Sequence, residues 1–106
     1  MSRHAVVTGA GSGIGLQVAK RFAGLGFRLT LADITPAPLA DAADACREAG
    51  AEDVSELIVD MGSALGPETL VAEAWALAPV DVLVNSAGVY PATPYLELNA
   101  GIWIRC

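Results

Sequence analysis

Four glycines stand close together near the start of the chain, where an apolar segment gives way to an amphipathic one. The segment Thr8-Gly9-Ala10-Gly11-Ser12-Gly13-Ile14-Gly15 follows Ala5-Val6-Val7. A strand that passes through glycines into a helix is the outline of a phosphate-binding turn. The first N–H groups of such a helix carry partial positive charge, so a bound anion gains roughly 0.3–1 kcal/mol. The alternative is a glycine-rich loop that binds nothing.

Glycine meets three different demands in this turn. Gly9 lets the chain leave the strand in a tight turn, and Gly13 lets the backbone approach a pyrophosphate closely because it has no Cβ. Gly15 allows the new helix to pack tightly against the sheet. We expect Thr8 to be structural and to tie the turn to a neighbouring strand.

Strands and helices alternate along the chain. The pattern predicts strands at 5–7, 28–32, 54–59 and 80–84, and helices that begin at Ile14, at Pro36 after an N-cap at Thr35, and at Gly66. Gly26, Gly50 and Pro79 are expected to end those helices. Such βαβ units predict a doubly wound parallel α/β sheet with strand order 3-2-1-4. We expect residues 102–106 to begin another helix.

Within the helices, apolar residues at helical spacing predict the buried faces. In the first helix these are Ile14, Val18, Phe22 and Leu25. In the third helix the residues expected to face inward are Leu70, Val71, Ala74, Trp75 and Leu77.

Polar residues follow the carboxyl ends of the predicted strands, where an open parallel sheet binds its ligands. Asp33 lies 18 residues after Gly15, near the roughly 20 expected of an acid that accepts hydrogen bonds from an adenosine ribose. Asp60 ends the third strand, with adenine contact and plain surface exposure both open. The segment Asn85-Ser86-Ala87-Gly88 ends the fourth strand.

Composition limits the classes of function. The 106 residues suit one domain, and 54% hydrophobic residues with a mean hydropathy of +0.50 argue against disorder. A net charge of −6 argues against a nucleic-acid partner. We expect neither a membrane span nor a metal site. Cys46 and Cys106 read as free thiols in a reducing compartment, and the absence of a signal-peptide core favours a cytoplasmic location.

The glycine segment together with Asn85-Ser86-Ala87-Gly88 resembles the short-chain dehydrogenase/reductase family, whose signatures are T-G-x-x-x-G-x-G and N-[NS]-A-G. The resemblance covers nearly the whole chain, with Trp103 similar to a tryptophan found after the strand-4 loop in many members. It implies a Rossmann-type fold and an oxidoreductase that interconverts alcohols and ketones by hydride transfer. It also implies a small alcohol or carbonyl substrate and a homo-oligomeric parent protein.

The resemblance further implies a set of cofactor-binding positions. They are Gly9, Ser12, Gly13, Ile14 and Gly15 at the pyrophosphate and nicotinamide, Asp33 and Ile34 at the adenosine ribose, Asp60 and Met61 at the adenine, and Asn85, Ala87 and Gly88 along the middle of the cofactor. A 2′-phosphate beside Asp33 would meet a like charge, and neither Ser12 nor Ile34 is basic, so we expect NAD rather than NADP.

The residues that perform the chemistry in this family, a serine and a Tyr-x-x-x-Lys pair, have no match in the chain. Tyr90 and Tyr95 are followed four residues later by proline and asparagine, and the only lysine is Lys20. His4 is expected to have a structural role at the start of its strand. We therefore expect residues 1–106 to be an NAD-binding domain truncated before the catalytic segment, without turnover of its own.

Truncation would also leave the fourth strand at the sheet edge and one sheet face partly uncovered, which predicts marginal stability. A nonenzymatic NAD-binding module and a methyltransferase that uses S-adenosylmethionine are the alternatives. A P-loop NTPase lacks support, because no Gly-Lys-Ser/Thr follows the glycines.

Overall fold

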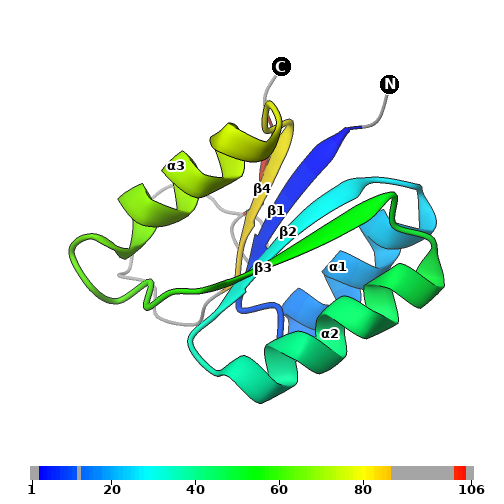
Figure 1. Ribbon diagram of the computed structural model, residues 1–106, viewed down its shortest axis with the longest axis horizontal. Helices are drawn as coiled ribbons and strands as arrows, with labels where there is room; N and C mark the ends of the chain where they lie inside the picture. The colour runs from blue at the N-terminus through cyan, green and yellow to red at the C-terminus, as the bar shows by residue number, and fades with distance from the viewer. Residues whose placement is uncertain (1–2, 12, 87–101, 105–106) are drawn as a thin grey trace.

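The computed structural model describes residues 3–11, 13–86 and 102–104 (Figure 1). Strands and helices alternate through most of this part of the chain. Their order is β1 (His4–Thr8), α1 (Gly13–Gly24), β2 (Arg28–Asp33), α2 (Pro36–Ala49), β3 (Asp53–Ile58), α3 (Gly66–Leu77), β4 (Val82–Asn85) and β5 (Ile102–Ile104). None of the described helices is long and apolar enough to cross a membrane.

One sheet contains all five strands, in the order β3-β2-β1-β4-β5. The first four pair in parallel, so the predicted order 3-2-1-4 is confirmed. The prediction of a helix over 102–106 is wrong, because Ile102–Ile104 pairs antiparallel with β4. The expected open edge at β4 is wrong for the same reason. β-branched and aromatic residues favour strands, and β5 gives partners to backbone groups that an edge strand leaves unpaired.

The two faces of the sheet are covered unequally. In Figure 1, α1 and α2 lie on one face and α3 lies on the other. Alternation along β1 serves both faces: Ala5 and Val7 join the larger core beneath α1 and α2, whereas Val6 joins a smaller core beneath α3. This arrangement is the doubly wound form that the alternating pattern predicted.

Small residues form the contact between α1 and the sheet. The buried residues of α1 are Gly15, Ala19 and Ala23, whereas Ile14 is 60% exposed and Leu25 is 68% exposed. The prediction that Ile14 and Leu25 face inward is therefore wrong. The reason is the closeness of the helix: a Cβ built on Gly15 would lie 2.2 Å from the carbonyl oxygen of Gly9. Larger side chains do not fit there, and Val18 and Phe22 are only partly buried, packed against the larger core.

On α3, only part of the predicted inward face is buried. Leu70 and Ala74 are buried, four residues apart and therefore on the same side of the helix. Val71, Trp75 and Leu77 are each 46–48% exposed, so the prediction that they face the core is wrong. A single helix lying on this face has room to bury one narrow row of side chains.

The predicted helix ends are mostly correct. Gly26 and Gly50 have φ angles of +83° and +120°, and both donate their N–H groups back to the preceding helix. Thr35 occupies the N-cap position before Pro36, but its side chain makes no capping hydrogen bond.

His4 has the structural role expected of it, although it is buried rather than at an exposed edge. It is 1% exposed, and its Nε2 lies 2.7 Å from Thr30 Oγ1. Its Nδ1 lies 3.0 Å from the carbonyl oxygen of Ala78. Since a carbonyl only accepts, Nδ1 carries the proton in this contact. The ring therefore ties the end of α3 to β1 and β2, at the opposite end of the sheet from the glycine turn.

We predict that Gly15→Ala lowers the free energy of unfolding by about 1–3 kcal/mol, the usual effect of overpacking. The added methyl group would meet backbone atoms of Gly9, which cannot move aside cheaply. Urea unfolding followed by circular dichroism measures the change. Gly24→Ala is the matched control, because a Cβ there meets nothing within 4 Å. Equal stability of the two variants would contradict the close packing of α1.

The buried thiol of Cys46 makes the free energy of unfolding depend on pH in the alkaline range. It is a free thiol with no exposed surface on α2. Burial raises the pKa of the Cys46 thiol above its ordinary value, although Lys20 and Arg47 act in the opposite direction. In the unfolded chain the thiol ionises at about pH 8.5. The unfolded state therefore loses this proton first, and we predict that the free energy of unfolding falls as the pH rises beyond that value.

The measurement is urea unfolding between pH 7 and pH 10, in a Cys106→Ser background so that a single thiol remains. Adding Cys46→Ala should remove part of the alkaline loss of stability. An identical loss with and without Cys46 would show that its ionisation is not linked to folding.

Candidate functional site

The turn between β1 and α1 depends on two glycines in the left-handed region. Gly9 has a φ of +62° and Gly13 a φ of +60°, which other residues rarely adopt. The predicted role of Gly9 in a tight turn is therefore confirmed. A Cβ on Gly13 would meet nothing within 4 Å, so this side of the backbone is open to an approaching group. The turn is anchored to the sheet by the Ala10 N–H, which donates to the Ala32 carbonyl at 3.1 Å.

Thr8 joins the end of β1 to the end of β4. Its hydroxyl donates to Asn85 Oδ1 at 3.0 Å and accepts from the Ser86 N–H at 3.0 Å. The Ser86 hydroxyl donates to the Thr8 carbonyl at 2.5 Å. Thr8 is completely buried, and its predicted structural role is confirmed. These hydrogen bonds hold Asn85 beside the glycine turn.

Asp33 lies at the end of β2, where backbone groups hold both oxygens of its carboxylate. Oδ2 accepts from the Gly11 N–H at 2.8 Å. Oδ1 accepts from the Ile34 N–H at 2.7 Å and from the Thr35 N–H at 3.3 Å. Three N–H groups thus fix the orientation of a half-buried carboxylate directly across from the turn.

Asp60 follows β3 and organises the short loop before α3. Its Oδ1 accepts from the Gly62 N–H at 2.8 Å, and its carbonyl accepts from the Ser63 N–H at 3.1 Å. The loop closes tightly onto the helix, since a Cβ on Gly66 would lie 2.0 Å from the Asp60 carbonyl oxygen. The start of α3 is thereby fixed close to the ends of the strands.

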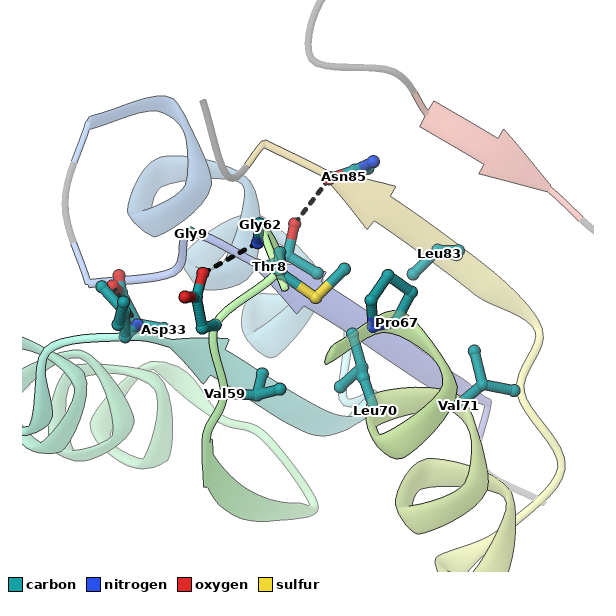
Figure 2. Close-up of a pocket in the computed structure, with 13 residues that line it drawn as sticks. Thr8, Gly9, Asp33, Val59, Gly62, Pro67, Leu70, Val71, Leu83 and Asn85 are labelled. Carbon is teal, nitrogen blue, oxygen red and sulfur yellow. Dashed lines mark hydrogen bonds between the residues drawn. The ribbon is translucent and has the colours of Figure 1, made fainter. Parts of the chain in front are cut away.

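These strand ends surround a cavity of about 350 Å³ (Figure 2), within the range of small-molecule sites. Six of the predicted site residues line it: Gly9, Asp33, Ile34, Asp60, Met61 and Asn85. They come from the carboxyl ends of β1, β2 and β4 and the segment that follows β3. The predicted meeting of these residues at one edge of the sheet is therefore observed.

The other predicted site residues lie elsewhere. Gly13, Ile14 and Gly15 form the first turn of α1 and do not line the cavity. Ile14 is exposed, and Gly15 is buried against the sheet. Ser12, Ala87 and Gly88 lie outside the described residues.

Sequence reasoning missed the apolar wall of the cavity. Figure 2 shows Pro67, Leu70 and Val71 of α3 opposite Leu83 of β4, with Val59 nearby. The signal for two of them was available: Pro67 and Val71 lie one turn apart at the start of a helix that follows a strand end. The sequence pattern predicted a core position for Val71, which remains 46% exposed, and for Pro67 it indicated only the start of the helix.

The cavity has a polar, acidic side and an apolar side. Asp33 and Asp60 are acidic, and no lysine or arginine is among the described residues that line it. The same part of the chain contains no group of three or more His, Cys, Asp or Glu residues placed to hold a metal ion. Such a cavity can accept donor hydroxyls at its carboxylates and a flat apolar group against α3.

Comparison with known proteins agrees with this arrangement. A family model described as short chain dehydrogenase matches residues 3–106. Galactitol 2-dehydrogenase (L-tagatose-forming) of Cereibacter sphaeroides is 43% identical over 99 residues, which are 93% of this chain and 38% of that protein. The chain therefore spans well under half the length of this relative.

Solved structures of other proteins share the fold, among them two that hold a nicotinamide cofactor. A short chain dehydrogenase/reductase from Burkholderia phymatum in complex with NAD has a TM-score of 0.75 and 40% identity, covering 83% of this chain and 31% of that one. L-sorbose reductase from Gluconobacter frateurii, complexed with NADPH and L-sorbose, has a TM-score of 0.74 and 34% identity, covering 83% and 34%. The family match removes the support for a methyltransferase. The chain belongs to the short-chain dehydrogenase/reductase family.

Proposed function

We propose that this chain is the dinucleotide-binding part of an NAD(H)-dependent oxidoreductase that interconverts an alcohol and its carbonyl counterpart. The observation that carries the proposal is the position of the Asp33 carboxylate in the same cavity as Gly9 and Asn85. An acid at the end of the second strand, across from a glycine turn, suits a ribose whose diphosphate lies at the start of the first helix.

The described residues fit such a cofactor in three respects. The open side of Gly13 admits a diphosphate to the backbone, and the unpaired N–H groups at the start of α1 attract its charge. The Asp33 carboxylate accepts hydrogen bonds from ribose hydroxyls. Asp60 and Met61 line the part of the cavity that follows β3, where we place the adenine.

Asn85, with Ala87 and Gly88, is assigned to the middle of the cofactor, and Asn85 is braced by Thr8. We assign Ser12, Ile14 and Gly15 to the diphosphate and nicotinamide side, and Ile34 to the ribose beside Asp33. Gly15 acts there by packing α1 against Gly9 and not by direct contact.

We propose NAD in preference to NADP. A 2′-phosphate would lie beside the Asp33 carboxylate, and like charges at close range cost several kcal/mol. The described lining of the cavity supplies no cation to offset this repulsion. The relatives alone do not decide the preference, since one solved structure holds NAD and another NADPH.

When bound, the nicotinamide supplies the acceptor or donor of a hydride. We expect this chain by itself to bind without turnover, because its sequence offers no Tyr-x-x-x-Lys pair. We propose a small alcohol or carbonyl substrate for the whole protein, in keeping with a relative named for galactitol. A homo-oligomeric parent and a reducing, cytoplasmic location complete the proposal, the latter supported by the free thiol of Cys46.

We predict that Asp33→Ala weakens NADH binding by about 10- to 100-fold, the effect of losing hydrogen bonds to a charged acceptor. NADPH binding should change less, because removing Asp33 also removes a repulsion. Separate titrations, followed by the fluorescence of NADH and of NADPH, measure the two dissociation constants. Asp41→Ala is the matched control, since Asp41 is an exposed acid on α2 that does not line the cavity.

Two results would contradict the proposal. One is wild-type protein, shown to be folded by circular dichroism, that binds neither NADH nor NADPH at millimolar concentrations. The other is equal weakening by Asp33→Ala and Asp41→Ala, which would reduce the role of Asp33 to its net charge.

A further inference from the structure

The side chains around Gly11, and not its own backbone conformation, leave no room for a side chain at this position. Its φ lies outside the left-handed region, so a positive φ is not what requires glycine here. A Cβ at this position would, however, lie 2.7 Å from Asp33 Oδ2 and 3.0 Å from the Cβ of Pro38. Two neighbours therefore exclude a side chain here, and the closer one is the carboxylate assigned to the ribose.

The same residue also holds that carboxylate. The Gly11 N–H donates to Asp33 Oδ2 at 2.8 Å, while the N–H groups of Ile34 and Thr35 donate to Oδ1. A carboxylate has about four acceptor directions, two on each oxygen. Both directions of Oδ1 are occupied, so one direction of Oδ2 has no donor among the residues that the structure describes and is available to a ligand. The N–H of Gly11 fills the other direction and thereby decides where the free one points.

We propose that Gly11 is a positioning residue for cofactor specificity: its N–H and its missing side chain set the orientation in which Asp33 meets the ribose. The inference rests on the proposed function and deepens it. Gly11 also belongs to the turn assigned to the diphosphate. A single hydrogen bond therefore joins the part of the site that holds the phosphates to the part that selects the sugar.

An added methyl group should act on binding more than on folding. The atom it would meet first is the end of the Asp33 side chain, which can rotate, unlike the backbone that confines Gly15. Rotation would break the Gly11 hydrogen bond and turn the free acceptor direction of Oδ2 away from the ribose. The Cβ of Pro38, 3.0 Å from the added methyl group, further limits the space available to it.

The test is a double-mutant cycle on the full chain. Dissociation constants for NADH and NADPH are measured by fluorescence for wild type, Gly11→Ala, Asp33→Ala and the double variant. We expect Gly11→Ala to weaken NADH binding by about 3- to 10-fold and to reduce the preference for NADH over NADPH. In the Asp33→Ala background the same substitution should have no further effect. Gly24→Ala, at an exposed position with open space, is the control.

Unchanged NADH binding in Gly11→Ala overturns the proposal. So does equal weakening with and without Asp33, because Gly11 would then act on the diphosphate directly. Wild-type protein that binds neither cofactor refutes the proposed function, and this proposal with it. Binding by wild type with no effect of Gly11→Ala refutes this proposal alone.

A second measurement does not need Gly11→Ala to fold. The amide proton of Gly11, observed by NMR, should move upfield in Asp33→Ala relative to wild type, because it loses a charged acceptor. An unchanged shift would show that the hydrogen bond is absent in solution and would overturn the proposal. Glu48→Ala, which removes an exposed acid of α2 that does not line the pocket beside Gly11, should leave this proton unaffected.

Discussion

The close packing of α1 on the carboxyl end of β1 is the constraint on which the site depends. Gly15 lies so near the Gly9 carbonyl that there is no room for a side chain: an added Cβ would lie 2.2 Å from the carbonyl oxygen. This contact sets the depth of α1 and therefore the position of its first N–H groups. The Ser86 hydroxyl, which donates to the Thr8 carbonyl, would lie 2.6 Å from the same added Cβ. Helix, first strand and fourth strand thus meet at one point, and the cavity lies beside it.

The fold could be predicted from sequence wherever a short pattern of residues is compatible with only one local structure. Glycines after apolar strands and helices marked the turns, and alternation of strands and helices led to the parallel order 3-2-1-4. The pairing of Ile102–Ile104 with β4 could not be found in this way. Three residues are too few to show a period, and their strand character depends on the partner that β4 offers.

The polar half of the site was predictable for the same reason, and the apolar half was not. Asp33, Asp60 and Asn85 each follow a strand, and parallel strands end at one edge of the sheet. Hydrophobic periodicity, by contrast, cannot separate a side chain that fills the core from one that lines a cavity. Leu70 does both: it is 1% exposed, packs in the core under α3 and also borders the cavity. The role of Gly11 was missed because it depends on Asp33, which lies 22 residues away in sequence.

An acidic protein can hold an anionic cofactor when its backbone supplies the positive charge. The chain has a net charge of −6. The carboxylates of Asp33 and Asp60, the two acids of the cavity, both accept hydrogen bonds from backbone N–H groups. Asp33 accepts three such bonds, which localises its charge without requiring a cation nearby. Oriented amides can likewise bind a diphosphate in the absence of lysine. The described lining of the cavity includes no lysine or arginine that could neutralise a further phosphate beside Asp33. The proposed preference for NAD over NADP therefore rests both on the Asp33 carboxylate and on the lack of a cation among the described residues of the cavity.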